Sequence, residues 1–124
     1  MDNQILDAQI KDAIGAHGMW KVKLKAAVTT GALPKPARDI ACDDQCAFGK
    51  WLYGLRSDSS VSSQSHYKSV MAKHAQFHKI AGRVAAEVER GNLSAASAIL
   101  TGSEYGSATD DLVTAMADWK RANR

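Results

Sequence analysis

Long apolar runs are absent from this sequence. No stretch of its 124 residues approaches the ~18 consecutive apolar residues that a membrane-spanning helix needs. The opening residues, 1–7, have neither the basic start nor the apolar core of a secretory signal peptide. We therefore expect a cytoplasmic protein with no membrane insertion.

Clusters of basic residues are absent as well. The net charge is only +3, with a pI near 9.0, and the lysines and arginines are scattered along the chain. A nucleic-acid-binding surface normally concentrates its positive charge in one run or on one face. The charge pattern therefore argues against a nucleic-acid partner.

Cysteine is scarce, with Cys42 and Cys46 as the two thiols of the chain. Cytoplasmic thiols stay reduced, so metal ligands or free thiols are favoured over a disulfide. If both cysteines lay on one helix they would be one turn apart, and a bridge between them would constrain very little.

Strand-like alternation of apolar and polar residues is also missing. Apolar residues instead recur at spacings of three and four, as on one face of a helix. The composition, 45% hydrophobic and 23% charged, is that of a soluble globular protein, and residues 1–124 suffice for a single domain with its own core. The pattern predicts an all-α protein, an antiparallel four-helix bundle with a short additional helix that carries Cys46.

The first helix is expected over residues 3–30. It ends at Gly31, shortly before Pro34 and Pro36, because proline can neither donate to nor continue a helix. Residues 31–43 then form a connector to the next segment.

A short helix is expected over residues 44–55. Asp43 or Asp44 is a suitable N-cap, which would place Cys46 in the first turn, and Gly54 is a suitable end. The positive end of the helix dipole should lower the pKa of the Cys46 thiol and favour the thiolate, the form that binds a metal.

Two further long helices complete the predicted bundle. A polar loop over residues 57–65 leads into a helix over 64–90, which the Gly-Asn pair at 91–92 separates from a last helix over 93–122. Residues 102–106 have low helix propensity, so we expect either a kink there or a close helix contact that the two glycines permit.

Histidine supplies the first indication of function. His74 and His78 lie one turn apart on one helix face, so both can reach a single metal ion, although such pairs also occur by chance. His17 strengthens the case, because it lies on the apolar stripe at the middle of the first helix. Three buried imidazoles without partners would lose their hydrogen bonds to water, a conflict that a metal ion removes. His66 lies near the start of its helix and is expected at the surface.

Cys46 is favoured over Cys42 as a fourth ligand. It opens a Cys-Ala-Phe-Gly-Lys-Trp run whose aromatic residues would bury the short helix beside the histidines, whereas Cys42 lies in the connector as a free thiol or a neighbour of the ligands. Three imidazoles and one thiolate form a complete tetrahedral set for Zn²⁺. The predicted metal site is therefore His17, Cys46, His74 and His78.

These residues resemble the motifs of the chemoreceptor zinc-binding (CZB) domain family. The family pattern is HxxW, then Cx(F/L)GxW, then HxxxH, with some two dozen residues between blocks. The chain matches each block, with residues 21–45 and 52–73 between them: His17 and Trp20; Cys46, Phe48, Gly49 and Trp51; His74 and His78.

The resemblance implies that the four residues bind zinc inside a four-helix bundle that serves as a cytoplasmic sensory module. Family members are attached to chemoreceptor signalling domains or diguanylate cyclases, or occur alone, and such relatives imply a homodimer. The zinc-bound cysteine is linked in the family to sensing oxidants such as hypochlorous acid. No output domain is part of this chain, so we expect either a stand-alone protein or a piece of a longer one, with its output in cis or in trans.

Enzyme activity is not expected. Four protein ligands leave no open position for water or substrate at zinc. Ala75 stands where an HExxH protease has its glutamate, and four histidines are too few for a hemerythrin-like di-iron site. Two alternatives to a sensor remain: zinc as the permanent staple of a dimerisation or interaction module, and a metal-free bundle with histidines in its core.

Overall fold

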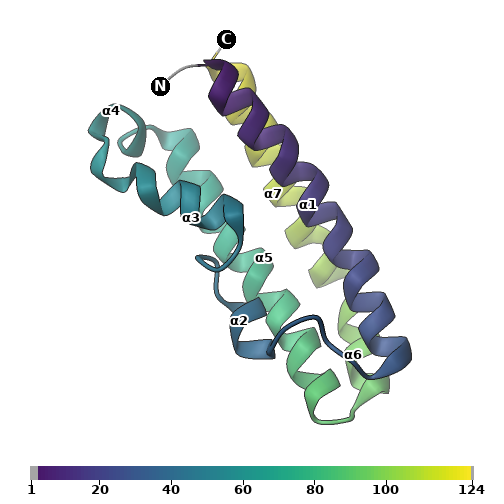
Figure 1. The fold of residues 1–124 in the computed structure, drawn as a ribbon. Coiled ribbons are helices and arrows are strands. Elements are labelled where there is room, and N and C mark those ends of the chain that lie inside the picture. Colours follow the sequence, from purple (N-terminus) through teal and green to yellow (C-terminus); the bar gives the residue numbers. More distant parts are fainter. Residues whose placement is uncertain (1–2, 124) are drawn as a thin grey trace.

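The computed structural model describes residues 3–123, which form helices and short connections without any strand (Figure 1). The prediction of an all-α protein is confirmed. None of the helices in this part of the chain is both long and apolar enough to cross a membrane. The elements in chain order are α1 (Asn3–Thr30), α2 (Ala37–Ala41), α3 (Ala47–Gly54), the 3-10 turn η1 (Leu55–Ser57), α4 (Ser59–Ser62), α5 (Ser65–Glu89), α6 (Leu93–Leu100) and α7 (Ser103–Ala122).

Helices α1, α5 and α7 are the long rods of the molecule. α5 packs against α7, α6 and α2, and α1 packs against α6, α7 and α5. In Figure 1, α1 and α5 run in one direction and α7 runs in the other. Between α1 and α5 in the sequence, the chain returns through α2, α3 and α4 in the direction opposite to α1. The chain direction therefore alternates from α1 to the α2–α4 segment, to α5 and to α7.

The apolar stripes predicted on the first and third helical segments face the core. Ile10 and Leu24 of α1 and Val70 and Phe77 of α5 are fully buried, as is Met116 of α7. Both predicted helix stops are also confirmed. The glycines at positions 31 and 91 have φ of 78°, the left-handed conformation that favours glycine at a helix C-terminus.

The connector expected over residues 31–43 contains a short helix, α2. Pro36 precedes this helix with φ −57°, a value suited to a helix start. The carboxylate of Glu89 accepts a hydrogen bond from the Ala37 amide at 2.9 Å. On its other side α2 lies so close to α5 that a Cβ added at Gly82 would be 2.4 Å from the Cβ of Ala41. A five-residue helix held in this way depends on tertiary contacts.

The short helix predicted over residues 44–55 starts later, at Ala47, and the predicted caps Asp43 and Asp44 are wrong. Cys46 is itself the N-cap, with extended backbone (φ −86°, ψ 159°), and its sulfur accepts a hydrogen bond from the Gly49 amide. The helix ends at Gly54 as predicted.

Two other segments differ from expectation. The polar loop predicted over residues 57–65 contains α4, where the Asp58 carboxylate accepts a hydrogen bond from the Ser60 amide at the helix start. The last predicted helix, 93–122, is broken between α6 and α7, so the expected kink is confirmed. A Cβ at Gly102 would lie 3.0 Å from the Ala98 carbonyl oxygen, which shows how closely α7 follows α6, whereas a Cβ at Gly106 would meet nothing within 4 Å.

Candidate metal centre

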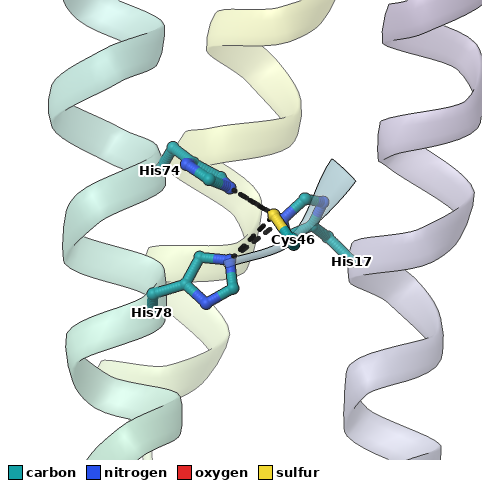
Figure 2. A group of neighbouring side chains, drawn as sticks. All are labelled: His17, Cys46, His74 and His78. Atoms are coloured by element: carbon teal, nitrogen blue, oxygen red, sulfur yellow. Dashed lines mark hydrogen bonds between the residues drawn. The ribbon is translucent and has the colours of Figure 1, made fainter. Parts of the chain in front are cut away.

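The structure brings all four predicted side chains together in the interior of the molecule (Figure 2). His17 comes from the middle of α1, Cys46 from the start of α3, and His74 and His78 from successive turns of α5. One ligand atom from each residue lies within 4.8 Å of the corresponding atoms of the other three. Cys42 is exposed and lies outside this group. His66 also lies outside it, and is half-buried rather than fully at the surface.

The separations of the ligand atoms match those of a tetrahedral zinc site. The Nε2 atom of His17 lies 3.0 Å from Nε2 of His74 and 3.3 Å from Nε2 of His78. The Cys46 sulfur lies 3.4 Å from Nε2 of His74 and 3.7 Å from Nε2 of His78. Zinc bonds of ~2.05 Å to nitrogen and ~2.3 Å to sulfur, at tetrahedral angles, separate two nitrogens by about 3.4 Å and a nitrogen from a sulfur by about 3.6 Å. These four separations are therefore close to those of a zinc ligand set, and all the ligand atoms lie within 4.8 Å of one another.

Backbone carbonyls determine which nitrogen of two rings carries the proton. His17 Nδ1 lies 2.7 Å from the Ala13 carbonyl oxygen, and His78 Nδ1 lies 2.9 Å from the Ile40 carbonyl oxygen. A carbonyl only accepts, so each Nδ1 is the N–H donor and each Nε2 carries a lone pair. These two lone pairs face each other across 3.3 Å, an arrangement that a cation between them stabilises.

His74 has no comparable backbone partner, since its Nδ1 is buried without a hydrogen bond. A proton on Nδ1 would leave a buried donor unpaired. A proton on Nε2 could be donated to Nε2 of His17, but the Nδ1 lone pair would then lack a donor. In either tautomer of the metal-free protein, one nitrogen of this buried ring therefore lacks a hydrogen-bond partner, although buried polar groups are normally paired.

Burial keeps the three imidazoles neutral. Their side chains are at most 2% exposed. Burial lowers the pKa of His17 to about 4, with a further contribution from the neighbouring His78. Burial and the two other imidazoles lower the pKa of His74 to about 2, and burial also lowers the pKa of His78. All three rings are therefore in the form that binds a metal at neutral pH.

The pKa of the Cys46 thiol differs from the value that its helix position predicted. Backbone amides at the start of α3, that of Gly49 foremost, do lower its pKa, but burial of the half-buried thiol outweighs them. The net pKa is raised, so the expectation of a lowered value is wrong. The metal-free protein therefore carries a thiol here, and a metal must displace its proton.

Aromatic rings pack against the imidazoles of the cluster. The His17 ring meets Phe77 and Phe48 edge-on, with centroids 5.3 Å and 6.0 Å apart. Trp20 lies edge-on to His78 at 6.4 Å. Phe48 stacks on Trp51 at 5.6 Å, which places the aromatic residues of the Cys-Ala-Phe-Gly-Lys-Trp run beside the histidines, as the sequence predicted.

Gly49 has a steric role at this site. A Cβ added there would lie 1.7 Å from the Asp43 carbonyl oxygen and 2.8 Å from its carbonyl carbon, so a larger residue would push the 43–46 turn away. The Tyr53 hydroxyl holds the same turn by donating to the Asp43 carboxylate, with oxygen separations of 2.8 Å and 3.1 Å. The turn before Cys46 is therefore held against α3 by two contacts.

Several of these supporting groups escaped the sequence analysis. The carbonyls of Ala13 and Ile40 have no sequence signal, because every residue has a carbonyl group. Gly82 did have a sequence signal. It follows His78 by one helical turn, and a glycine inside a long helix often marks a close backbone approach. In the structure that approach is by α2, which carries Ile40.

Three imidazoles and one thiol that converge from three helices are a ligand set typical of a metal-binding helical domain. In a comparison with protein-family models, residues 17–85 match the chemoreceptor zinc-binding domain, and this stretch contains all four side chains. The match covers more than half of the chain, which therefore belongs to the chemoreceptor zinc-binding domain family. Neither a curated protein nor a solved structure matches the chain.

Proposed function

We propose that His17, Cys46, His74 and His78 bind one zinc ion, and that zinc occupancy or the oxidation state of Cys46 is a signal in the cytoplasm. The observation that carries the proposal is the convergence of three imidazole nitrogens and one sulfur within 4.8 Å of one another, with four separations close to those of a tetrahedral zinc site. The receiver would be a chemoreceptor signalling domain or a diguanylate cyclase, in cis or in trans. Family membership supports this choice of output.

The ligand types favour zinc and a non-catalytic role. Imidazole and thiolate suit zinc, whereas magnesium and calcium prefer oxygen. When bound, zinc would supply a positive charge that holds α1, α3 and α5 together. Four protein ligands leave no position for a substrate, which supports regulation rather than catalysis.

The mobile element of this sensor is α3. Its far end is tied to α5, because the Tyr67 hydroxyl donates a 2.7 Å hydrogen bond to the carbonyl of the buried Leu52. Its near end is held at the cluster by the Cys46 sulfur and by burial of Phe48. Loss of the sulfur as a ligand removes the first of these holds and leaves α1 and α5 packed on each other and on α7. We further infer that α2, α3 and α4 together make the second member of a four-helix bundle.

Oxidation offers a second input to the same atom. With hydrogen peroxide, the Cys46 thiolate forms an S–O bond as the O–O bond breaks and hydroxide leaves, and the sulfur loses two electrons. The resulting sulfenic acid is a poorer metal ligand. Oxidation would therefore free α3 as metal loss does.

Elemental analysis and hydrogen exchange together test this proposal. We expect one zinc per chain in the reduced protein, with affinity weakened at least tenfold in Cys46→Ala and His78→Ala, and faster amide exchange in α3 once zinc is removed. A folded, reduced protein that takes up no zinc would leave a metal-free bundle. Zinc that stays bound at every free-zinc level found in cells would favour the permanent staple over the sensor.

The outer face of α1 favours a dimerisation role beside sensing. Ile5, Met19 and Val22 are the exposed large hydrophobic side chains of residues 3–123, at 53%, 52% and 58% exposure. They belong to an exposed series that alternates in steps of three and four, the repeat of a coiled-coil seam, at positions 5, 8, 12, 15, 19, 22 and 26. A helix of this length offers a seam of about 40 Å. We propose that a second copy of the chain covers this face with its own α1.

Charge selects the antiparallel arrangement for this homodimer. Asp12 belongs to the seam and Lys23 lies beside it, three turns further along α1. An antiparallel pair brings Asp12 of each copy near Lys23 of the other, whereas a parallel pair aligns like charges. Light scattering should show a dimer for the parent, a monomer for Met19→Glu with Val22→Glu, and a dimer for the control Ala95→Glu on α6. Lys23→Asp should weaken the dimer, and the double variant that adds Asp12→Lys should restore it. A parent protein that is monomeric would refute the interface.

A further inference from the structure

A cleft opens onto the metal cluster from one side. It lies between α1 and the start of α3, has a volume of about 320 Å³, and is lined by nine residues that include Gln9, Asp12, Ala16, His17, Cys46 and Ala47. Six water molecules at about 30 Å³ each occupy about 180 Å³. The cleft is therefore large enough for a hydrated divalent cation or a small oxidant.

The cluster faces this cleft with its sulfur. His17, His74 and His78 are at most 2% exposed, whereas Cys46 is the one member of the group that is not fully buried. Cys46 and His17 line the cleft, while the two histidines of α5 do not. A small molecule that enters from this side meets the sulfur before it meets the histidines of α5.

We propose that this cleft is the entrance through which zinc and small thiol oxidants reach Cys46, a proposal that rests on the zinc-sensing function above. Its rim is open because Ala16 and Ala47 have small, exposed side chains. The side-chain amide of Gln9 supplies an oxygen that can replace a water of an incoming cation. The entrance leaves the rest of the bundle closed during exchange.

Thiol chemistry on the zinc-free protein tests the entrance without relying on zinc binding. In a Cys42→Ser background, Cys46 is the remaining thiol, and its reaction rate with N-ethylmaleimide reports access to the sulfur. Ala16→Leu and Ala47→Leu place larger side chains in the rim, and we expect each to slow the reaction at least tenfold. Ala95→Leu, at an exposed position on α6, is the matched control and should react like the parent. Circular dichroism and thermal unfolding of each variant verify the fold.

Zinc exchange supplies the second measurement. Transfer of zinc from the loaded protein to a chromophoric chelator should slow in Ala16→Leu and Ala47→Leu, while equilibrium affinity stays within about twofold of the parent. Rates unchanged in folded rim variants, or slowed equally by Ala95→Leu, would overturn the proposal and show that access requires opening of the bundle. A parent that binds no zinc but shows the expected maleimide rates would refute the zinc function and leave the entrance intact.

Discussion

Gly82→Ala should weaken zinc binding although residue 82 contacts no ligand atom. The added Cβ would lie 2.4 Å from the Ala41 Cβ and 2.7 Å from its Cα, so α2 must move away by about 1 Å to reach ordinary contact distance. The same helix carries the Ile40 carbonyl, which accepts the 2.9 Å hydrogen bond from His78 Nδ1. Displacement by that amount takes this bond beyond the usual limit of about 3.2 Å.

The expected loss of affinity is about 10- to 100-fold, the usual effect of removing a hydrogen bond that orients a metal-binding histidine. In free energy this is about 1.4–2.8 kcal/mol. Competition with a chromophoric zinc chelator measures it directly. Helix propensity acts in the opposite direction, because alanine favours a helix interior over glycine by about 1 kcal/mol. Weaker zinc binding therefore cannot come from a weakened α5 helix.

Gly106→Ala is the matched control. It makes the same change in the helix interior of α7, where an added Cβ meets nothing within 4 Å. This variant should be more stable to heat by up to about 1 kcal/mol and should bind zinc like the parent. Parent-like affinity in Gly82→Ala would refute the argument that α2 positions His78.

Three further predictions concern protons and the turn before Cys46. Zinc binding at pH 7 should release about one proton per ion, because the Cys46 thiol has a raised pKa. The apparent zinc affinity should therefore rise about tenfold per pH unit between pH 6 and 8. A pH indicator in weak buffer measures the proton release, and two or more protons per zinc would contradict neutral imidazoles. The zinc-free protein should lose stability as pH falls below 6.5 toward 4, because the lowered pKa of His17 and His74 means that the unfolded chain binds protons first. The slope in urea denaturation should reach about 1.4 kcal/mol per pH unit for each proton, and stability that is constant over this range would be inconsistent with the buried, neutral rings. Gly49→Ala should lower zinc affinity more than Gly54→Ala, because a Cβ at Gly49 collides with the backbone of Asp43 and one at Gly54 meets nothing within 4 Å; equal affinities in a chelator titration would show that the turn adapts.

Much of the fold was predictable because α1 and α5 bury continuous stripes, and a stripe is a property of local sequence spacing. The four side chains of the cluster were predictable for a related reason, since histidine is unusual on such a stripe. The small helix α2 was not, because its stability comes from Glu89 and from the close approach at Gly82, both distant in sequence. The direction of the Cys46 pKa was missed because it depends on burial, which helix position alone does not specify.

The hydrogen bond between Tyr67 and Leu52 makes the far end of α3 a pivot. Leu52 is six positions after Cys46, so the sulfur sits at the end of an arm of about 9 Å. A tilt of about 10° moves it by about 1.6 Å, enough to turn a zinc–sulfur bond of ~2.3 Å into a separation without bonding. With zinc bound as proposed, α3 would therefore act as a lever arm, in which a tilt of about 10° carries the sulfur out of bonding distance.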